Sequence, residues 1–268
     1  MSKIFALDKS KIRQSFGAAS SSYDGAAGLQ RTVGKELLRT IDGAKLTGTL
    51  LDLGCGTGFV TGELLALLRC QQMVALDIAL PMLQTTRNKL LSGKKHENES
   101  VQYLCADAEQ LPLADQVIDG IFSNLALQWC RSPEAVFADI KRVLKADGQL
   151  VFSTFGPQTL KELKAAWAEV DDYHHVNEFY SEEQLKYFLQ QAGFRDLQVE
   201  SNLYISDYDS VLELMKELKQ IGAHNVSAGR NKQSTTKTQM QGMIAAYEKH
   251  RTSNLIPATF DVIMVVAK

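Results

Sequence analysis

The pattern of apolar and polar positions divides the chain into a helical start and a long alternating part. Residues 7 to 42 place apolar side chains at helical spacing, for example Ile12, Phe16, Val33 and Leu37. From residue 47 onwards, β-like runs alternate with segments of helical periodicity. This alternation predicts a mostly parallel sheet with helices on both of its faces.

The first five β-like runs and the helices between them follow directly from this pattern. The runs are TLLDL at 49–53, MVALD at 73–77, VQYLCAD at 101–107, VIDGIFSN at 117–124 and QLVFSTF at 149–155. Helices are expected over about 59–69, 80–91 and 133–145. The polar run SGKKHENES at 92–100 predicts a solvated loop before the third strand.

The last third of the chain predicts a hairpin of edge strands with a long helical insertion. A helical stretch near 181–192 ends at Gly193, a typical helix stop. Two β-like runs, LQVESNLYI at 197–205 and TFDVIMVVAK at 259–268, flank about fifty mainly helical residues. We therefore expect an α/β fold with a seven-stranded, mostly parallel sheet and an antiparallel edge strand. Residues 1–46 would form a helical cap and 47–268 the main domain, with an insertion at about 207–256 that covers the substrate.

The composition and net charge of the chain are ordinary for a globular protein. The chain has 268 residues, 45% of them apolar and 22% charged, with a net charge of -2. These values are typical of a globular protein and give no reason to expect nucleic acid or a membrane as a partner. The N-terminus lacks the apolar core of a signal peptide, and no stretch approaches the roughly 18 apolar residues of a membrane span.

The cysteines predict reduced thiols in a cytoplasmic protein. Cys55, Cys70, Cys105 and Cys130 lie 15, 35 and 25 positions apart, without a C-x-x-C pair. His174 and His175 adjoin two aspartates, but no third ligand is identifiable. We therefore expect neither a disulfide framework nor a metal site.

A glycine-rich turn, LLDLGCGTG at 50–58, follows the first predicted strand. Ligands of open parallel sheets bind beyond the carboxyl ends of strands, so this turn is a candidate binding site. A dinucleotide fingerprint would need a small residue at Phe59, whereas Gly58 comes one position early. This spacing weakens the hypothesis of a pyrophosphate site.

The sequence LDLGCGTG closely resembles the glycine loop of S-adenosylmethionine-dependent methyltransferases of the Rossmann-like class. The resemblance implies that Gly54, Gly56 and Gly58 let the backbone approach the amino-acid and ribose parts of the cofactor. It also places Asp52 where a carboxylate can meet the cofactor's ammonium group. The alternative is that Asp52 only ties down the glycine turn.

Two aspartates at the next strand ends strengthen this interpretation. Asp77 lies 23 positions after Gly54, and its two oxygens can accept both ribose hydroxyls. Asp107 can accept the adenine amino hydrogen while the Ala108 N–H donates to a ring nitrogen. Either aspartate alone could be a helix cap, but the glycine loop and both aspartates together indicate S-adenosylmethionine. The predicted cofactor pocket is completed by Ile78, Met82 and Asn124, with Leu80 as a further wall, although core packing also explains Met82 and Leu80.

The sequence at the end of the fourth predicted strand limits the class of methyl acceptor that we expect. Amino methyltransferases often carry an Asn/Asp-Pro-Pro-aromatic turn here, whereas this chain has Ser123-Asn124-Leu125-Ala126. A nucleobase amine is therefore not the expected acceptor, which agrees with the absence of a strongly basic composition.

Several longer segments resemble the malonyl-acyl-carrier-protein O-methyltransferases of biotin synthesis, from about residue 11 to the C-terminus. They are FGAASSSYDGAAGLQ at 16–30, SNLALQWC at 123–130, STFGPQTLKEL at 153–163, HVNEF at 175–179 and LKQIGAHN at 218–225. The resemblance implies transfer of a methyl group from S-adenosylmethionine to the free carboxylate of a malonyl thioester. The partner would be malonyl-acyl carrier protein or malonyl-coenzyme A.

Such a reaction needs positioning more than acid–base chemistry. A carboxylate is already ionised at pH 7 and is itself a nucleophile, so we expect no catalytic acid or base. Candidates for positioning are Tyr23, Gln128, Trp129, Phe155, His175, Arg142 and Arg230. The RVLKADG context of Arg142 favours a structural ion pair instead, and Tyr23 and Trp129 are better suited to be pocket walls.

The insertion also carries an excess of positive charge. The segment from Lys216 to Arg251 contains seven basic residues and two acidic ones. This excess could attract an acidic carrier protein, or it could belong to an ordinary solvated helical face. The alternatives to the whole interpretation are another carboxyl or carbon methyltransferase, an NAD(P)-dependent oxidoreductase and a catalytically inert cofactor-binding protein.

Overall fold

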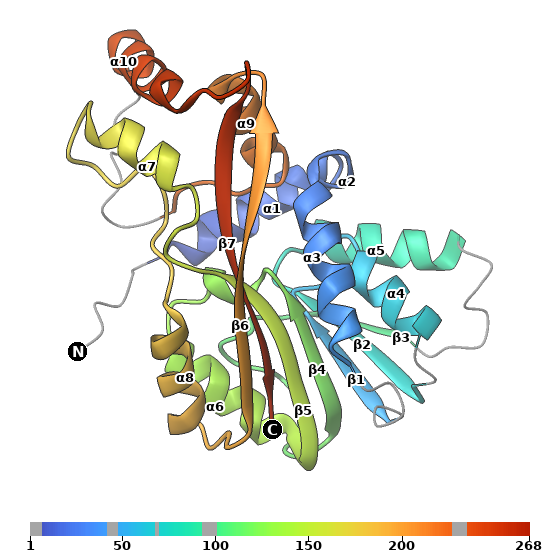
Figure 1. Cartoon of the computed structure of the whole chain (residues 1–268). Helices are drawn as coiled ribbons and strands as arrows, with labels where there is room; N and C mark the ends of the chain where they lie inside the picture. Colours follow the sequence, from blue (N-terminus) through green and yellow to red (C-terminus); the bar gives the residue numbers. More distant parts are fainter. Residues whose placement is uncertain (1–6, 42–47, 68–69, 93–100, 227–234) are drawn as a thin grey trace.

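A seven-stranded sheet in the order β3-β2-β1-β4-β5-β7-β6 forms the centre of the protein (Figure 1). The computed structural model describes residues 7–41, 48–67, 70–92, 101–226 and 235–268. The strands are β1 (Thr49–Leu53), β2 (Gln72–Asp77), β3 (Val101–Cys105), β4 (Ile118–Asn124), β5 (Leu144–Phe155), β6 (Leu197–Tyr208) and β7 (Ile256–Ala267). The first five pair in parallel, whereas β7 runs antiparallel to both β5 and β6.

Helices cover both faces of the sheet because successive strand residues point to opposite sides. Leu51 and Leu53 of β1 pack in the cluster that holds α6 (Pro133–Val143) and α8 (Glu182–Gln191). Leu50 packs in the opposite cluster with α3 (Gly28–Arg39) and α4 (Phe59–Leu67). The helix α5 (Leu80–Ser92) lies beside α4 (Figure 1). Burial of these apolar residues on both faces is the main force that holds the layers together.

Helix starts are fixed by local capping residues. Ser132 precedes α6 and its side chain accepts from the Ala135 N–H, with Pro133 at the first helical position. Ser181 and Gln184 form a reciprocal capping box at the start of α8. These caps satisfy N–H groups that have no partner within the helix, so the sequence sets where each helix begins.

The strand order reverses between β1 and β4, and this reversal defines where a ligand can bind. The chain leaves β1 toward β2 on one side, whereas β4 and β5 extend the sheet on the other. The loops that follow β1 and β4 therefore diverge and leave a crevice at their carboxyl ends.

Helices from the two ends of the sequence meet above that crevice. The N-terminal part forms α1 (Lys9–Ala19), α2 (Tyr23–Ala26) and α3, all before β1. Between β6 and β7 the chain forms α9 (Val211–Gln220), α10 (Lys237–Tyr247) and the short η3 (Glu248–His250). The Ser22 hydroxyl donates to the Gln220 carbonyl oxygen over 2.9 Å, and Ala26 and Ala27 pack with Ile221. The cap and the insertion therefore support each other.

The predicted sheet architecture is confirmed, including the hairpin whose strands flank the helical insertion. The antiparallel strand is β7, which lies one position in from the edge because β6 covers it. Two elements were not predicted, the helix α7 (Lys161–Ala168) and the short η2 (Leu127–Trp129). Most of the predicted solvated loop, residues 93–100, lies outside the described residues.

Candidate active site

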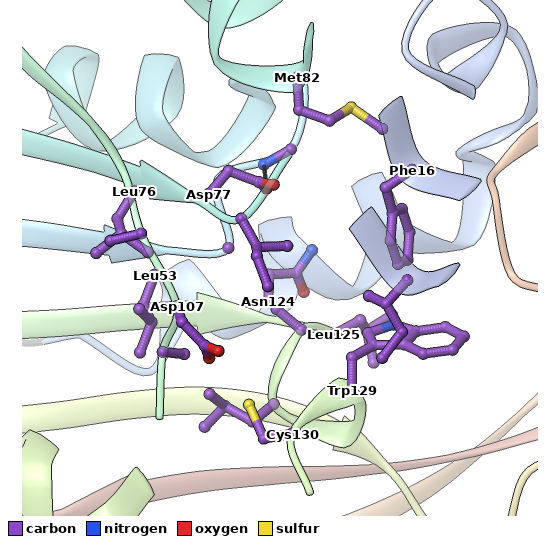
Figure 2. A pocket seen from close by; sticks show the side chains of 18 of the residues that line it. Phe16, Leu53, Leu76, Asp77, Met82, Asp107, Asn124, Leu125, Trp129 and Cys130 are labelled. Carbon is purple, nitrogen blue, oxygen red and sulfur yellow. Dashed lines mark hydrogen bonds between the residues drawn. The ribbon is translucent and has the colours of Figure 1, made fainter. Parts of the chain in front are cut away.

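A cavity of about 740 Å³, open to solvent, lies at the carboxyl ends of β1, β2 and β4 and beside β3. Figure 2 shows Asp77 and Asp107 on one side of this space and Phe16 and Trp129 on another. Its wall includes Lys9, Ile12, Phe16, Tyr23, Gly54, Gly56, Asp77, Ile78, Met82, Asp107, Ala108, Asn124, Leu125, Trp129 and Cys130. We call it the strand-end cavity. Most of the predicted cofactor residues therefore surround one space.

The three glycines of the loop have different structural roles, although all adopt positive φ angles that favour glycine. A Cβ on Gly54 would lie 2.3 Å from the Ala126 Cβ, whereas one on Gly56 would meet nothing within 4 Å. Gly58 is absent from the wall of the strand-end cavity, and a Cβ there would lie 2.6 Å from the Thr86 Cγ2. Its position therefore supports packing of α4 against α5 rather than the predicted cofactor contact.

Asp77 holds the glycine loop from the end of β2. Its Oδ2 accepts from the Gly56 N–H at 2.9 Å and its Oδ1 from the Ala79 N–H at 2.8 Å. Burial raises the pKa of Asp77, and these N–H groups offset part of that rise. Each carboxylate oxygen can accept a further hydrogen bond, so the side chain can bind hydroxyl donors while it fixes the loop.

Asp52 faces a second cavity, of about 440 Å³, behind the glycine loop. We call it the loop cavity; Tyr23, Asp24, Gln30, Arg31, Gly54, Thr57 and Asn124 also line it. Asp52 is 1% exposed, and its Oδ2 accepts from the Thr61 hydroxyl at 2.5 Å. Burial, with a smaller contribution from the Asp77 charge, raises the pKa of Asp52 to about 7. A cationic ligand in the loop cavity would favour the ionised form.

The raised pKa of Asp52 predicts a specific change in stability with pH. Between its unfolded value of 3.8 and about 7, the folded state binds more protons than the unfolded state, so stability falls as the pH rises. We expect the free energy of unfolding of Asp52→Asn, relative to the wild type, to rise by about 2–3 kcal/mol between pH 5 and pH 8. Urea denaturation of both ligand-free proteins at these pH values measures this. Parallel pH profiles would contradict the assignment.

Asp107 is engaged by a residue that sequence reasoning did not predict. The Lys9 ammonium, at the start of α1, contacts Asp107 and also lies 2.7 Å from Glu109 Oε2. Partial burial alone would raise the pKa of Asp107, but Lys9 and the Glu109 N–H outweigh it, so this pKa lies below its usual range. Lys9 therefore ties α1 to the end of β3.

The other residues predicted around the adenine divide into those that line the cavity and one that does not. Ile78, Met82 and Ala108 are on the cavity wall, and Met82 is fully buried. Leu80 is 52% exposed and is not on the wall. The prediction for Leu80 is therefore wrong, because α5 begins there and turns its side chain toward solvent.

Asn124 lies at the boundary of the strand-end and loop cavities. Its Nδ2 donates to the Gln30 carbonyl oxygen at 2.9 Å, and its Oδ1 accepts from the Ser153 hydroxyl at 2.9 Å. The side chain thus connects β4 with the cap helix α3 and with β5. Asn124 is placed where it could contact a ligand, but its two hydrogen bonds hold neighbouring elements of the protein together.

A third cavity, of about 640 Å³, opens between the cap, the insertion and the segment after β5. We call it the insertion cavity; it is lined by Leu29, Gln30, Trp129, Phe155, Thr159, Leu160, Leu163, His175, Val176, Asn177, Phe179, Glu217, Leu218, Ile221, Ala223, His224, Asn225 and Phe260. Trp129 lines both this and the strand-end cavity, and its ring packs edge-on against Phe16 at 5.2 Å. A largely apolar space thus adjoins the cavity at the strand ends.

The positioning candidates occupy different places around these spaces. Tyr23 lines the strand-end and loop cavities, and its pKa is raised because burial and Asp77 disfavour the phenolate. Phe155 lines the insertion cavity, as does His175, which stacks on Trp167 at 3.7 Å and has Nε2 2.7 Å from Asp171 Oδ1.

Three further candidates are structural residues or lie outside the described part. Gln128 donates from Nε2 to the Leu125 carbonyl oxygen at 2.7 Å and lines a separate apolar pocket. Arg142 bonds Asp139 Oδ1 at 2.6 Å and Asp115 Oδ1 at 2.7 Å, away from the three cavities. Arg142 therefore forms a structural ion pair and is no longer considered as a residue that positions the acceptor. Arg230 lies outside the described residues.

The state of the cysteines, possible metal ligands and possible membrane helices can be described for the ranges that the structure covers. None of the four cysteines, all of which lie in those ranges, forms a disulfide. No group of three His, Cys, Asp or Glu side chains in those ranges is arranged to hold a metal ion. In the same ranges, no helix is long and apolar enough to cross a membrane.

Comparisons with known proteins agree with this architecture. Residues 51–152 match the Methyltransferase domain family. The chain superimposes on the YcgJ protein of Bacillus subtilis with a TM-score of 0.63 at 16% identity, covering 88% of this chain and 97% of that one. It also matches phosphoethanolamine N-methyltransferase 2 of Haemonchus contortus, solved with S-adenosyl-L-methionine, with a TM-score of 0.58 at 16% identity, covering 94% and 57% of the two chains.

Sequence relatives match almost the whole chain. Malonyl-[acyl-carrier protein] O-methyltransferase of Laribacter hongkongensis is 39% identical over 98% of this chain and 90% of its own length. The corresponding protein of Methylovorus sp. is 39% identical over 97% and 88%. The bifunctional protein BioHC of Cellvibrio japonicus is also 39% identical, but this chain spans only 50% of its length.

The fold, the glycine loop and the matched domain define a methyltransferase of the Rossmann-like class. More narrowly, the chain belongs to the malonyl-[acyl-carrier protein] O-methyltransferase family, as the segments outside the glycine loop predicted. The alternative of an oxidoreductase is thereby set aside.

Proposed function

We propose that this protein transfers a methyl group from S-adenosylmethionine to the free carboxylate of malonyl-acyl carrier protein, giving a methyl ester for biotin synthesis. The observation that carries the proposal is the 39% identity that extends over 98% of the chain. It includes the cap and the insertion, which line the insertion cavity, and not only the common methyltransferase core. The match therefore also covers the segments that we propose to hold the acceptor.

The residues at the strand ends fit the proposed cofactor. The positive φ angles of Gly54 and Gly56, and the open space at Gly56, leave backbone exposed where a ligand can pass closely. Asp77 would accept the ribose hydroxyls, and Asp107 with the Ala108 N–H would bind the adenine between Ile78 and Met82. Asp52 would face the ammonium group in the loop cavity.

Bound S-adenosylmethionine would supply an electrophilic methyl group on a positively charged sulfur. The surrounding residues have to align the acceptor carboxylate and exclude water, because water stabilises separated charges more than charges that cancel. Phe155, Phe179 and Trp129 provide such an apolar wall in the insertion cavity. No protein base is needed, since the acceptor carboxylate is ionised at pH 7.

Rates with a panel of acceptors test the substrate. We expect methyl transfer to malonyl-acyl carrier protein to exceed transfer to free malonate and to other free carboxylic acids by at least about 100-fold in kcat/KM, because remote binding energy favours the thioester-linked acyl group. Malonyl-coenzyme A in the same panel measures how much the carrier protein itself contributes. Equal rates with free acids would favour the alternative of a general carboxyl methyltransferase.

Docking of an acidic carrier protein on the basic insertion stays a prediction. Lys216 and Lys219 are exposed on α9, whereas Lys249 is 2.5 Å from Glu169 and Arg251 is 2.5 Å from Glu248. Part of this segment, including Arg230 and Lys232, lies outside the described residues.

A further inference from the structure

The side-chain amide of Gln30, on the first turn of α3, has no hydrogen-bond partner among the described residues. Its Oε1 is fully buried, and it is the only buried side-chain oxygen or nitrogen in the described ranges that lacks a partner. A buried unpaired acceptor costs free energy, so such a group calls for an explanation. A ligand that supplies the missing partner is one.

The position of Gln30 identifies which ligands could reach it. It lines both the loop cavity, with Asp52 and Asn124, and the insertion cavity, with Trp129 and Phe155. Its own carbonyl oxygen accepts from Asn124 Nδ2 at 2.9 Å, which fixes the backbone of this turn against β4. Gln30 therefore lies on a fixed backbone at the junction of the two spaces.

Three other polar side chains of the insertion cavity, those of Thr159, Asn177 and Glu217, already have partners. The Thr159 hydroxyl donates to the Asp261 carbonyl oxygen at 3.0 Å, and Asn177 Oδ1 accepts from the Val226 N–H at 3.3 Å. Glu217 Oε1 accepts from the Tyr208 hydroxyl at 2.9 Å. A ligand that pairs with the Gln30 amide breaks no existing hydrogen bond, whereas a ligand that pairs with these groups competes with the bonds they already make.

We propose that the Gln30 amide bridges the two substrates: its Oε1 accepts from the ammonium group of the cofactor, and its Nε2 donates to the acceptor carboxylate. The inference rests on the proposed function, which places a cation in the loop cavity and a carboxylate in the insertion cavity. A neutral amide offers one acceptor and two donors. It orients both charges without neutralising either, unlike a lysine or an arginine, which would hold the carboxylate more strongly in the ground state.

Two substitutions of Gln30 separate these contacts. Gln30→Leu removes both, whereas Gln30→Glu keeps an acceptor for the ammonium group but presents a negative charge to the carboxylate. Gln191→Glu, on the exposed surface of α8, is the matched control for the added charge. S-adenosylhomocysteine affinity by calorimetry and kcat/KM with malonyl-acyl carrier protein from pH 5.5 to 8 are the readouts, with circular dichroism to show that the variants are folded.

For Gln30→Leu we expect both quantities to fall by about 10- to 150-fold, the range for a hydrogen bond to a charged group. For Gln30→Glu we expect S-adenosylhomocysteine affinity within about threefold of the wild type or tighter. Its kcat/KM should fall by at least about 10-fold at pH 8 and recover relative to the wild type as the pH falls, because the protonated side chain donates again.

Two results would overturn the bridge: turnover of Gln30→Glu near the wild-type value at pH 8, or a loss of its S-adenosylhomocysteine affinity equal to that of Gln30→Leu. The activity of the wild type with malonyl-acyl carrier protein distinguishes failure of the bridge from failure of the proposed function. If the wild type does not methylate malonyl-acyl carrier protein, the proposed function is wrong. The cofactor half of the bridge is then still judged from the three affinities, and equal values would overturn it.

Discussion

Replacing Asp77 by alanine is expected to weaken S-adenosylhomocysteine binding by about 10²- to 10⁴-fold, because two hydroxyl hydrogen bonds to a carboxylate are lost at about 1.5–3 kcal/mol each. The same side chain holds the Gly56 N–H at 2.9 Å and the Ala79 N–H at 2.8 Å. Its loss would therefore also release the glycine loop. Calorimetry with the purified variant measures the change.

Two further variants make this experiment interpretable. Asp147→Ala removes an exposed carboxylate that makes no hydrogen bond with the described part of the chain, and this variant should bind S-adenosylhomocysteine like the wild type. Asp77→Asn keeps the shape but turns an N–H toward one of the backbone donors, so it should bind nearly as poorly as alanine. A folded Asp77→Ala protein with affinity within about threefold of the wild type would show that this aspartate is not the ribose ligand.

Gly54→Ala is expected to lower the free energy of unfolding by about 2–5 kcal/mol and to impair cofactor binding. The new Cβ would sit at a φ of +80° and 2.3 Å from the Ala126 Cβ, so two separate costs add. Combining it with Ala126→Gly removes the clash and leaves the backbone strain, so about half of the loss should return. Urea denaturation of the two single variants and the double variant measures this coupling.

Gly25→Ala is the control for the glycine substitution, because a Cβ there meets nothing within 4 Å. It should change stability by less than about 1 kcal/mol. If Gly54→Ala and Ala126→Gly acted independently, the close contact between the glycine loop and the segment after β4 would not limit residue size at position 54.

The sequence was sufficient for features that depend on local pattern. Strand alternation separates Leu50 from Leu51 and so predicts two buried faces, and both clusters are present. The spacing of Gly54, Gly56, Asp77 and Asp107 places them at successive strand ends, and they line one cavity.

Contacts between distant segments could not be read from the sequence. Lys9 reaches Asp107 across 98 positions, and no motif marks it. Gln30 was part of the family-like segment at 16–30 but gave no signal of its own, because its significance comes from an unpaired oxygen at the junction of two cavities. Gly58 looked equivalent to its neighbours, yet only the fold shows that it approaches Thr86.

Mass spectrometry of malonyl-acyl carrier protein after incubation with the enzyme and S-adenosylmethionine tests the central claim most directly. We predict a gain of one methyl group, located on the malonyl part of the acyl-phosphopantetheine fragment released from the carrier protein. An unchanged mass, or a methyl group on the polypeptide of the carrier protein, would contradict the proposed function.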